Sequence, residues 1–133
     1  MIAYAVEPDL DVSSFIEVLE RSGLSTLRPI ADRERMARVL RGSSIVLTAR
    51  EGDRLVGVSR ALTDFGWVCY LCDLAVDGGF QRRGIGRELV RRTHAAAGSE
   101  TALVLRAAAA ARDYYARIGM AKIDNAWMFN RAR

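Results

Sequence analysis

The residues with the clearest chemical potential form a glycine-rich stretch, Gln81-Arg82-Arg83-Gly84-Ile85-Gly86, that opens an amphipathic segment. The unpaired N–H groups at the start of a helix point outward along its axis and carry the positive end of the helix dipole. Glycine lets a ligand approach those groups closely, because it has no side chain in the way. The stretch therefore predicts a site where backbone amides hold an anion such as a phosphate.

Two phosphate-binding motifs do not fit this stretch. A Walker loop needs Lys-Ser or Lys-Thr after its last glycine, where this sequence has Arg87-Glu88. The dinucleotide-binding fingerprint needs a third glycine at the position of Leu89. A third pattern, Gln/Arg-x-x-Gly-x-Gly/Ala, is matched at every position from Gln81 to Gly86.

The elements around this stretch follow from hydrophobic periodicity and turn residues. Strands are predicted at residues 2–6, 45–50, 55–63, 67–76, 101–105, 120–123 and 126–129, and helices at 11–23, 32–40, 85–97 and 108–118. The order is β-α-α-β-β-β-α-β-α-β-β, an α/β arrangement with a mixed, mostly antiparallel sheet flanked by helices. At 133 residues the chain has room for a single domain, 1–133.

This order and its motifs resemble the GCN5-related N-acetyltransferase (GNAT) family, in a bacterial-type, single-domain form. The glycine stretch resembles the loop that cradles the CoA pyrophosphate, Asp73 to Val76 resembles the strand before it, and Tyr114 to Met120 resembles the end of the family's last helix. Met120 replaces a common phenylalanine, and residues 107–111 lack the polar side chain that many relatives place near CoA. The resemblance covers nearly the whole chain and implies the acyl-CoA N-acyltransferase (GNAT) fold.

The resemblance implies acetyl-CoA as co-substrate and no metal. The pyrophosphate would lie on the glycine stretch, and the pantetheine would pair with the strand before it, where the N–H groups of Leu74 and Val76 would hold the acetyl carbonyl. The expected cofactor-binding residues are Leu74, Ala75, Val76, Gln81, Arg82, Arg83, Gly84, Ile85, Gly86 and Arg87.

For the chemistry, the resemblance implies direct attack of an amine on the thioester, with Tyr115 as the general acid that protonates the CoA thiolate. Tyr114, about 100° round the helix, is expected to pack in the core. Asp73 lies in an otherwise apolar segment, so it needs a partner, solvent or a role. A general base acting through water and an ion pair with an arginine both remain open for it.

The acceptor would lie near the loop 23–30 and the strand 55–63. Arg28 and Arg60 suit an acidic acceptor, whereas Asp64 and Asp73 suit a cationic amine, so the charges point both ways. A small-molecule amine and a peptide amine therefore both remain candidates.

Composition argues against a nucleic-acid-binding protein, a membrane protein and a redox or zinc site. The net charge of +4 is modest and scattered, so no nucleic-acid partner is expected. Of twenty basic residues only Lys122 is a lysine, which fits either a coding bias towards arginine or a phosphate-bearing ligand. No leader peptide or bilayer-spanning run appears, which predicts a cytoplasmic protein without membrane contact. Cys69 and Cys72 lie three apart on a predicted strand and so point to opposite faces, which favours two buried thiols over a redox or zinc site.

The sequence therefore predicts an acetyl-CoA-dependent N-acetyltransferase, an acyltransferase that moves acetyl to an amine. The alternative is a non-catalytic CoA or acetyl-CoA sensor or interaction domain of the same fold. Homodimers are frequent in the resembled family, which leaves a homodimer open for this chain.

Overall fold

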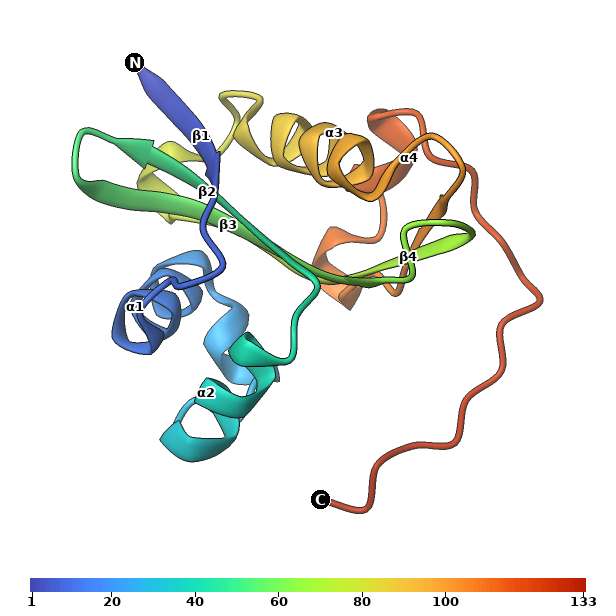
Figure 1. The fold of residues 1–133 in the computed structure, drawn as a ribbon, viewed down its shortest axis with the longest axis horizontal. Helices are drawn as coiled ribbons and strands as arrows, with labels where there is room; N and C mark the ends of the chain where they lie inside the picture. Colours follow the sequence, from blue (N-terminus) through green and yellow to red (C-terminus); the bar gives the residue numbers. More distant parts are fainter.

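The computed structural model describes residues 1–133, apart from the side chains of Ser25 and Thr26. Five strands form one sheet in the order of the sequence: β1 (Ile2–Val6), β2 (Ile45–Glu51), β3 (Arg54–Thr63), β4 (Val68–Val76) and β5 (Ala102–Leu105). The first four strands pair antiparallel, and β5 pairs parallel to β4. The α/β fold with a mixed, mostly antiparallel sheet is thus confirmed (Figure 1).

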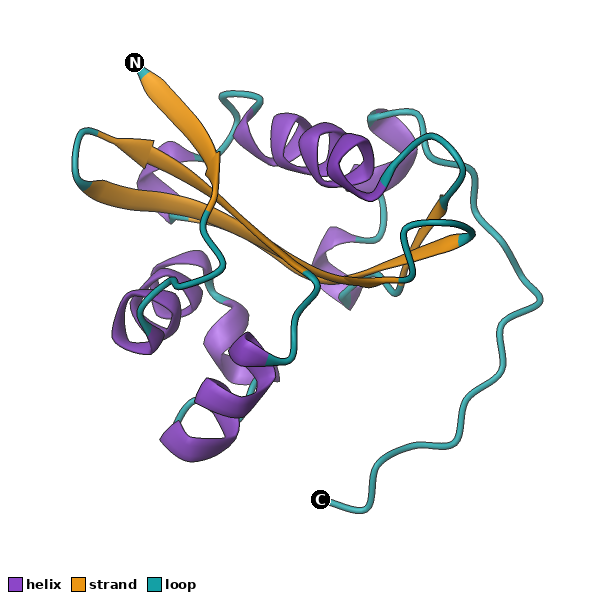
Figure 2. Ribbon diagram, in the orientation of Figure 1, coloured by secondary structure: helices purple, strands orange, loops and turns teal.

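Helices cover both faces of the sheet, as Figure 2 shows. The helices α1 (Val12–Ser22) and α2 (Arg33–Arg41) lie on one face, and α3 (Ile85–Ala97) lies on the other. The short helix α4 (Tyr114–Arg117) and three 3₁₀ turns, η1 (Leu24–Leu27), η2 (Gly78–Phe80) and η3 (Ala109–Ala111), connect and close the structure. Aspartates begin both helices of the first layer, because the Asp11 and Asp32 carboxylates each accept a first-turn backbone N–H at 3.1 Å.

Each face of the sheet has its own hydrophobic core. Phe15 and Leu19 of α1 and Met36 of α2 are almost fully buried against one face. Ile85 and Leu89 of α3 are buried against the other. The amphipathic stripes seen in the sequence therefore become two packed layers around one sheet.

Helix α3 comes close to the sheet at Gly57 on β3. A Cβ atom at this position would lie 3.1 Å from Leu89 Cδ1, 3.3 Å from Ile85 Cγ2 and 3.4 Å from Ala49 Cβ. The missing side chain therefore sets how closely the helix packs. This contact matters for function because the same helix begins at the glycine stretch.

A β-bulge at Cys72 changes the direction of the side chains along β4. Arg60 pairs with Asp73, and Ala61 pairs with Leu71, so Cys72 is the extra residue between two pairs. Cys69, before the bulge, packs in the α3-side core, whereas Ala75, after it, packs in the α1-side core. A single inserted residue has this effect because side chains on a strand alternate with a period of two.

The C-terminal part of the chain departs from the predicted elements. The predicted helix 108–118 is reduced to η3 and α4, and the strands predicted at 120–123 and 126–129 do not form. The residues have strand-like composition, but no neighbouring strand pairs with them, and hydrogen bonding to a neighbour is what makes a strand. The segment runs away from the sheet (Figure 1) with Trp127 and Phe129 exposed, and Arg35 Nη2 donates to the Arg133 carbonyl at 2.9 Å.

The other predicted strands and helices are confirmed to within a few residues. None of the helices among the described residues has the length and apolar content that crossing a bilayer requires.

Replacing Gly57 with valine should lower the free energy of unfolding by about 1–3 kcal/mol, because the added methyl groups overpack the contact with Leu89 and Ile85. Urea denaturation measures this change. Gly66→Val is the matched control, because its added Cβ would meet nothing nearer than 3.9 Å. Equal stability of the two variants would contradict the close approach of α3.

Candidate functional site

A cavity of about 920 Å³ opens between the end of β4, the start of α3 and the C-terminal helix. Four segments of the chain line it, and they meet only in the folded protein. The lining residues are Ser22, Gly23, Leu24 and Leu27; Leu74, Ala75 and Val76; Phe80, Gln81, Arg82, Gly84, Ile85, Gly86 and Arg87; and Ala108, Ala109, Ala110, Ala111, Tyr114, Tyr115, Arg117 and Ile118. The structure therefore brings the glycine stretch, the predicted pantetheine strand and Tyr115 into one site.

The floor of the cavity is the free edge of β4. The parallel pairing with β5 ends at Leu71↔Leu105, so residues 72–76 have a strand neighbour only on the β3 side. The bulge at Cys72 lies at the point where the pairing ends. Backbone amides and carbonyls on this edge can bond an extended ligand as a further strand would.

The glycine stretch forms a tight turn into α3. Gly84, with φ 79°, is the N-cap, and the first helical bond of α3 runs from the Glu88 N–H to the Gly84 carbonyl at 3.1 Å. The N–H groups of Ile85, Gly86 and Arg87 precede that bond and are left for a ligand by helix geometry. Arg82 also adopts a positive φ of 65°, which is uncommon outside glycine and typical of a turn held by its surroundings.

The basic side chains of this turn have different positions. Arg82 and Arg87 line the cavity, whereas the guanidinium of Arg83 lies 4.9 Å from the centre of the Phe80 ring and does not line it. Gln81 Nε2 donates to the Val76 carbonyl at 3.0 Å, which ties the turn to the end of β4. Nine of the ten residues predicted to bind the cofactor thus line the cavity, and Arg83 is the exception.

Asp77 anchors the approach to the turn, and sequence analysis did not single it out. Its carboxylate accepts from Arg21 Nε at 2.8 Å, from Arg54 Nη2 at 3.0 Å and from the Gly79 N–H at 2.9 Å. Burial raises the pKa of Asp77, but these hydrogen bonds outweigh it and hold the pKa below its ordinary value. An aspartate directly before Gly-Gly is a signal for such a turn.

The two tyrosines both face the cavity. Their rings are 5.2 Å apart at 81°, an edge-to-face contact, and both are half-buried. Tyr114 does not pack in the core as predicted, because its hydroxyl lies over Gly86 at the start of α3. Burial raises the pKa of Tyr115, so its hydroxyl keeps its proton at neutral pH.

A small side recess of about 60 Å³ adjoins the cavity. It is lined by Leu24, Arg28, Leu71, Cys72, Leu74, Leu105, Arg106, Ala108, Ala111 and Tyr115. Tyr115 lines both spaces, together with Leu24 and Leu74. The tyrosine therefore stands where the two spaces meet.

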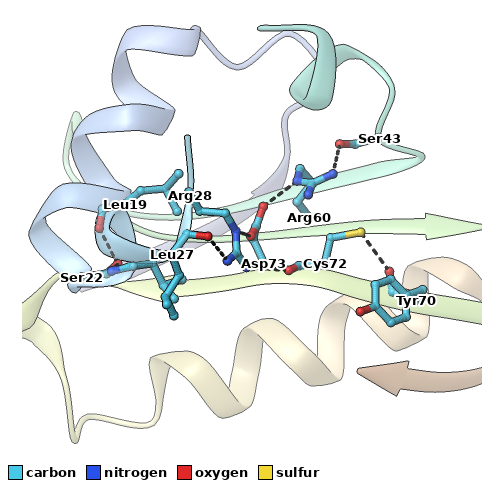
Figure 3. A network of polar contacts seen from close by, with 10 residues as sticks. Leu19, Ser22, Leu27, Arg28, Ser43, Arg60, Tyr70, Cys72 and Asp73 are labelled. Carbon is cyan, nitrogen blue, oxygen red and sulfur yellow. Dashed lines mark hydrogen bonds and ion pairs between the residues drawn. The ribbon is translucent and has the colours of Figure 1, made fainter. Parts of the chain in front are cut away.

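Asp73 is held between two arginines, as Figure 3 shows. Its two oxygens accept from Arg28 Nε and Arg60 Nε, each at 2.6 Å, and the side chain is only 1% exposed. Arg28 also donates to the carbonyls of Leu27 at 3.0 Å and Cys72 at 3.1 Å. The geometry matches the ion-pair alternative for Asp73, and Arg60 lies behind it, outside the lining of both spaces.

Asp64 lies away from the site, in the β3–β4 turn. Its Oδ1 accepts the N–H groups of Gly66 at 3.0 Å, Trp67 at 2.8 Å and Val68 at 3.1 Å. These bonds lower the pKa of Asp64 and explain its position. The thiols of Cys69 and Cys72 are free, and burial raises the pKa of both.

Gly86→Ala should destabilise the protein, because the new Cβ would lie 2.6 Å from the Tyr114 hydroxyl oxygen. Tyr114→Phe removes that oxygen, so the double variant should recover about 1 kcal/mol or more relative to the sum of the single changes. Urea denaturation of all four proteins gives this coupling. Additive effects would show that the hydroxyl does not lie over Gly86.

The comparisons with known proteins agree with this geometry. The sequence model of the acetyltransferase (GNAT) domain matches residues 15–132. No match was found among the curated proteins. Among solved structures, a probable acetyltransferase from meticillin-resistant Staphylococcus aureus is 18% identical, with 98% of this chain and 99% of the other covered and a TM-score of 0.81.

The names of two further proteins of solved structure give the compounds on which those proteins act. An aminoglycoside acetyltransferase from an uncultured soil metagenomic sample, in complex with sisomicin, is 20% identical over 99% of this chain and 96% of the other, with a TM-score of 0.74. The glucosamine-6-phosphate N-acetyltransferase of Arabidopsis thaliana is 16% identical over 100% and 99%, with a TM-score of 0.69. Identities this low show a shared fold, while the match of the domain model over most of the chain shows the family. The chain belongs to the GNAT family of acetyltransferases.

Proposed function

We propose that this protein transfers acetyl from acetyl-CoA to the amine of a small molecule, with Tyr115 as the general acid. The observation that carries the proposal is one cavity lined by the start of α3, by residues 74–76 of the free β4 edge and by Tyr115. The solved relatives named for aminoglycoside and glucosamine-6-phosphate support an acceptor of small-molecule size.

The residues present fit acetyl-CoA. The open N–H groups of α3, with Arg82 and Arg87 beside them, suit a pyrophosphate in charge and position. The edge of β4 from 74 to 76, which has no neighbouring strand and where Gln81 occupies only the Val76 carbonyl, suits the amides of pantetheine. None of the described residues that line the cavity is a carboxylate, so no lining side chain repels the phosphates.

The chain's own groups then supply part of the chemistry. The β4 edge aligns the thioester and its amides can polarise the acetyl carbonyl. Tyr115 donates its hydroxyl proton to the leaving sulfur, and the pKa of Tyr115, raised by burial, keeps the hydroxyl protonated at neutral pH. Because Asp73 is occupied by Arg28 and Arg60, we propose that solvent, rather than Asp73, takes the proton of the attacking amine.

A sensor that binds acetyl-CoA without turnover is the competing function. Incubation with acetyl-CoA and a panel of small amines, followed by detection of free thiol, separates the two. An enzyme releases thiol only when an acceptor is present, whereas a sensor binds acetyl-CoA and releases none.

Tyr115→Phe should lower kcat by about a hundredfold or more, because the leaving sulfur loses its proton donor. The affinity for acetyl-CoA, measured by calorimetry, should stay within about twofold, since the change removes an interaction used in the transition state. Tyr114→Phe is the matched control and should retain most of kcat. Similar kcat values for the two variants would show that Tyr115 is not the general acid.

Gly84→Ala should weaken acetyl-CoA binding by about fivefold or more, because φ 79° costs a residue with a side chain about 1 kcal/mol and distorts the turn. Gly52→Ala is the control, since Gly52 also has a positive φ, of 59°, and open space around it, but lies in the β2–β3 hairpin. Both variants should lose similar stability, and only Gly84→Ala should lose affinity in calorimetry. Equal affinities would place the anion site elsewhere.

A further inference from the structure

The side recess adjoins the cavity beside Tyr115. It shares Tyr115, Leu24 and Leu74 with the cavity, and it lies against the segment of β4 where the pairing with β5 ends. On the proposed function, on which this inference rests, the thioester lies beside Tyr115. A molecule whose amine reaches the thioester can therefore extend its other groups into the recess.

The charge of the recess is positive. Two of its lining residues, Arg28 and Arg106, are arginines, and none of the described lining residues is a carboxylate. The three bonds from Arg28 to Asp73, Leu27 and Cys72 leave two of its five N–H donors for a ligand. Arg106 follows the end of β5, is exposed and forms no ion pair within the described part of the chain.

The carboxylates that suit a cationic acceptor are engaged elsewhere. Asp73 is almost fully buried and binds two guanidinium groups, so the cluster of Arg28, Arg60 and Asp73 keeps a net positive charge. Asp64 binds three backbone N–H groups in a turn outside the lining of both spaces. Of the two kinds of acceptor that the sequence left open, an acidic one and a cationic amine, the arrangement of charges thus favours the acidic one.

We propose that the acceptor amine carries an anionic group, a carboxylate or a phosphate, which Arg28 and Arg106 bind in the side recess. Guanidinium groups bind both anions through paired N–H donors. The volume of about 60 Å³ exceeds the 10–15 Å³ that one water requires and suits a small charged group. Asp73 acts as a positioning residue, because it fixes the guanidinium of Arg28 at the wall of the recess.

The test compares amines that differ only in the anionic group, at saturating acetyl-CoA. Glucosamine 6-phosphate against glucosamine forms the phosphate arm, and an α-amino acid against its amide forms the carboxylate arm. The amide is the less basic amine and so has more of its reactive neutral form, which biases that arm against the proposal. We expect kcat/KM to be at least tenfold higher for the anionic member in one of the arms, and that arm identifies the anion.

Arg106→Gln should reduce that preference by about tenfold while acetyl-CoA affinity is unchanged, and Arg106→Lys should retain part of it. Arg112→Gln is the matched control, an exposed arginine near the recess that lines neither space, and it should leave the preference intact. Because Arg106 is exposed, its replacement should not unfold the protein.

The outcomes separate this inference from the proposed function. Neutral amines acetylated as fast as their anionic partners, or a preference that survives Arg106→Gln, overturn the anion recess and leave the acetyltransferase standing. Acetyl-CoA binding without thiol release from any amine overturns the acetyltransferase, and the inference with it.

Discussion

The separation of β4 from β5 is the constraint on which the site depends. Four residue pairs join the two strands, from Val68↔Ala102 to Leu71↔Leu105, and the bulge at Cys72 then bends β4 and changes the faces to which its side chains point. Beyond this point the backbone of β4 has a free edge inside the protein. A buried edge needs hydrogen-bond partners, and an extended ligand can supply them.

The same bulge arranges the charges. It places Asp73 on the side of the sheet where Arg28 and Arg60 can reach it, and it leaves Leu74 and Val76 against the α3-side core. Asp77, at the end of the strand, holds Arg21 and Arg54 in a similar way. Burying such carboxylates is costly unless they are paired, so these two aspartates position arginines around the site.

Both backbone groups and side chains contribute to the candidate site. The backbone of the glycine turn and of β4 offers N–H groups whose positions depend on the fold and little on residue identity. In the proposed function, the specific chemistry comes from three side chains: Tyr115 between the two spaces, and Arg28 and Arg106 in the recess. Residues 107–111, where the family's polar residue is missing, are alanines that line the cavity from Ala108 onward.

By itself, the sequence determined the elements with a strong local signal, because periodicity, caps and glycine turns act over a few residues. These elements include α1, α2, α3, the strands from β1 to β5 and the turn at Gly84. It also contained the family motifs around Gln81 and Tyr115, although Arg83 of that turn lies outside the cavity. The anchoring by Asp77 also has a local signal, an aspartate directly before two glycines.

Only the tertiary structure decided the rest, because it depends on contacts between residues far apart in the chain. The strands predicted at residues 120–123 and 126–129 do not form, because a strand needs a neighbouring strand to bond with, and the apolar pattern of these residues does not supply one. The partner of Asp73 is 45 residues away at Arg28, and the position of Tyr114 over Gly86 joins α4 to α3. Local sequence shows that a carboxylate in an apolar strand needs a partner. Which arginines pair with Asp73 depends on the fold, because Arg28 and Arg60 come from other elements.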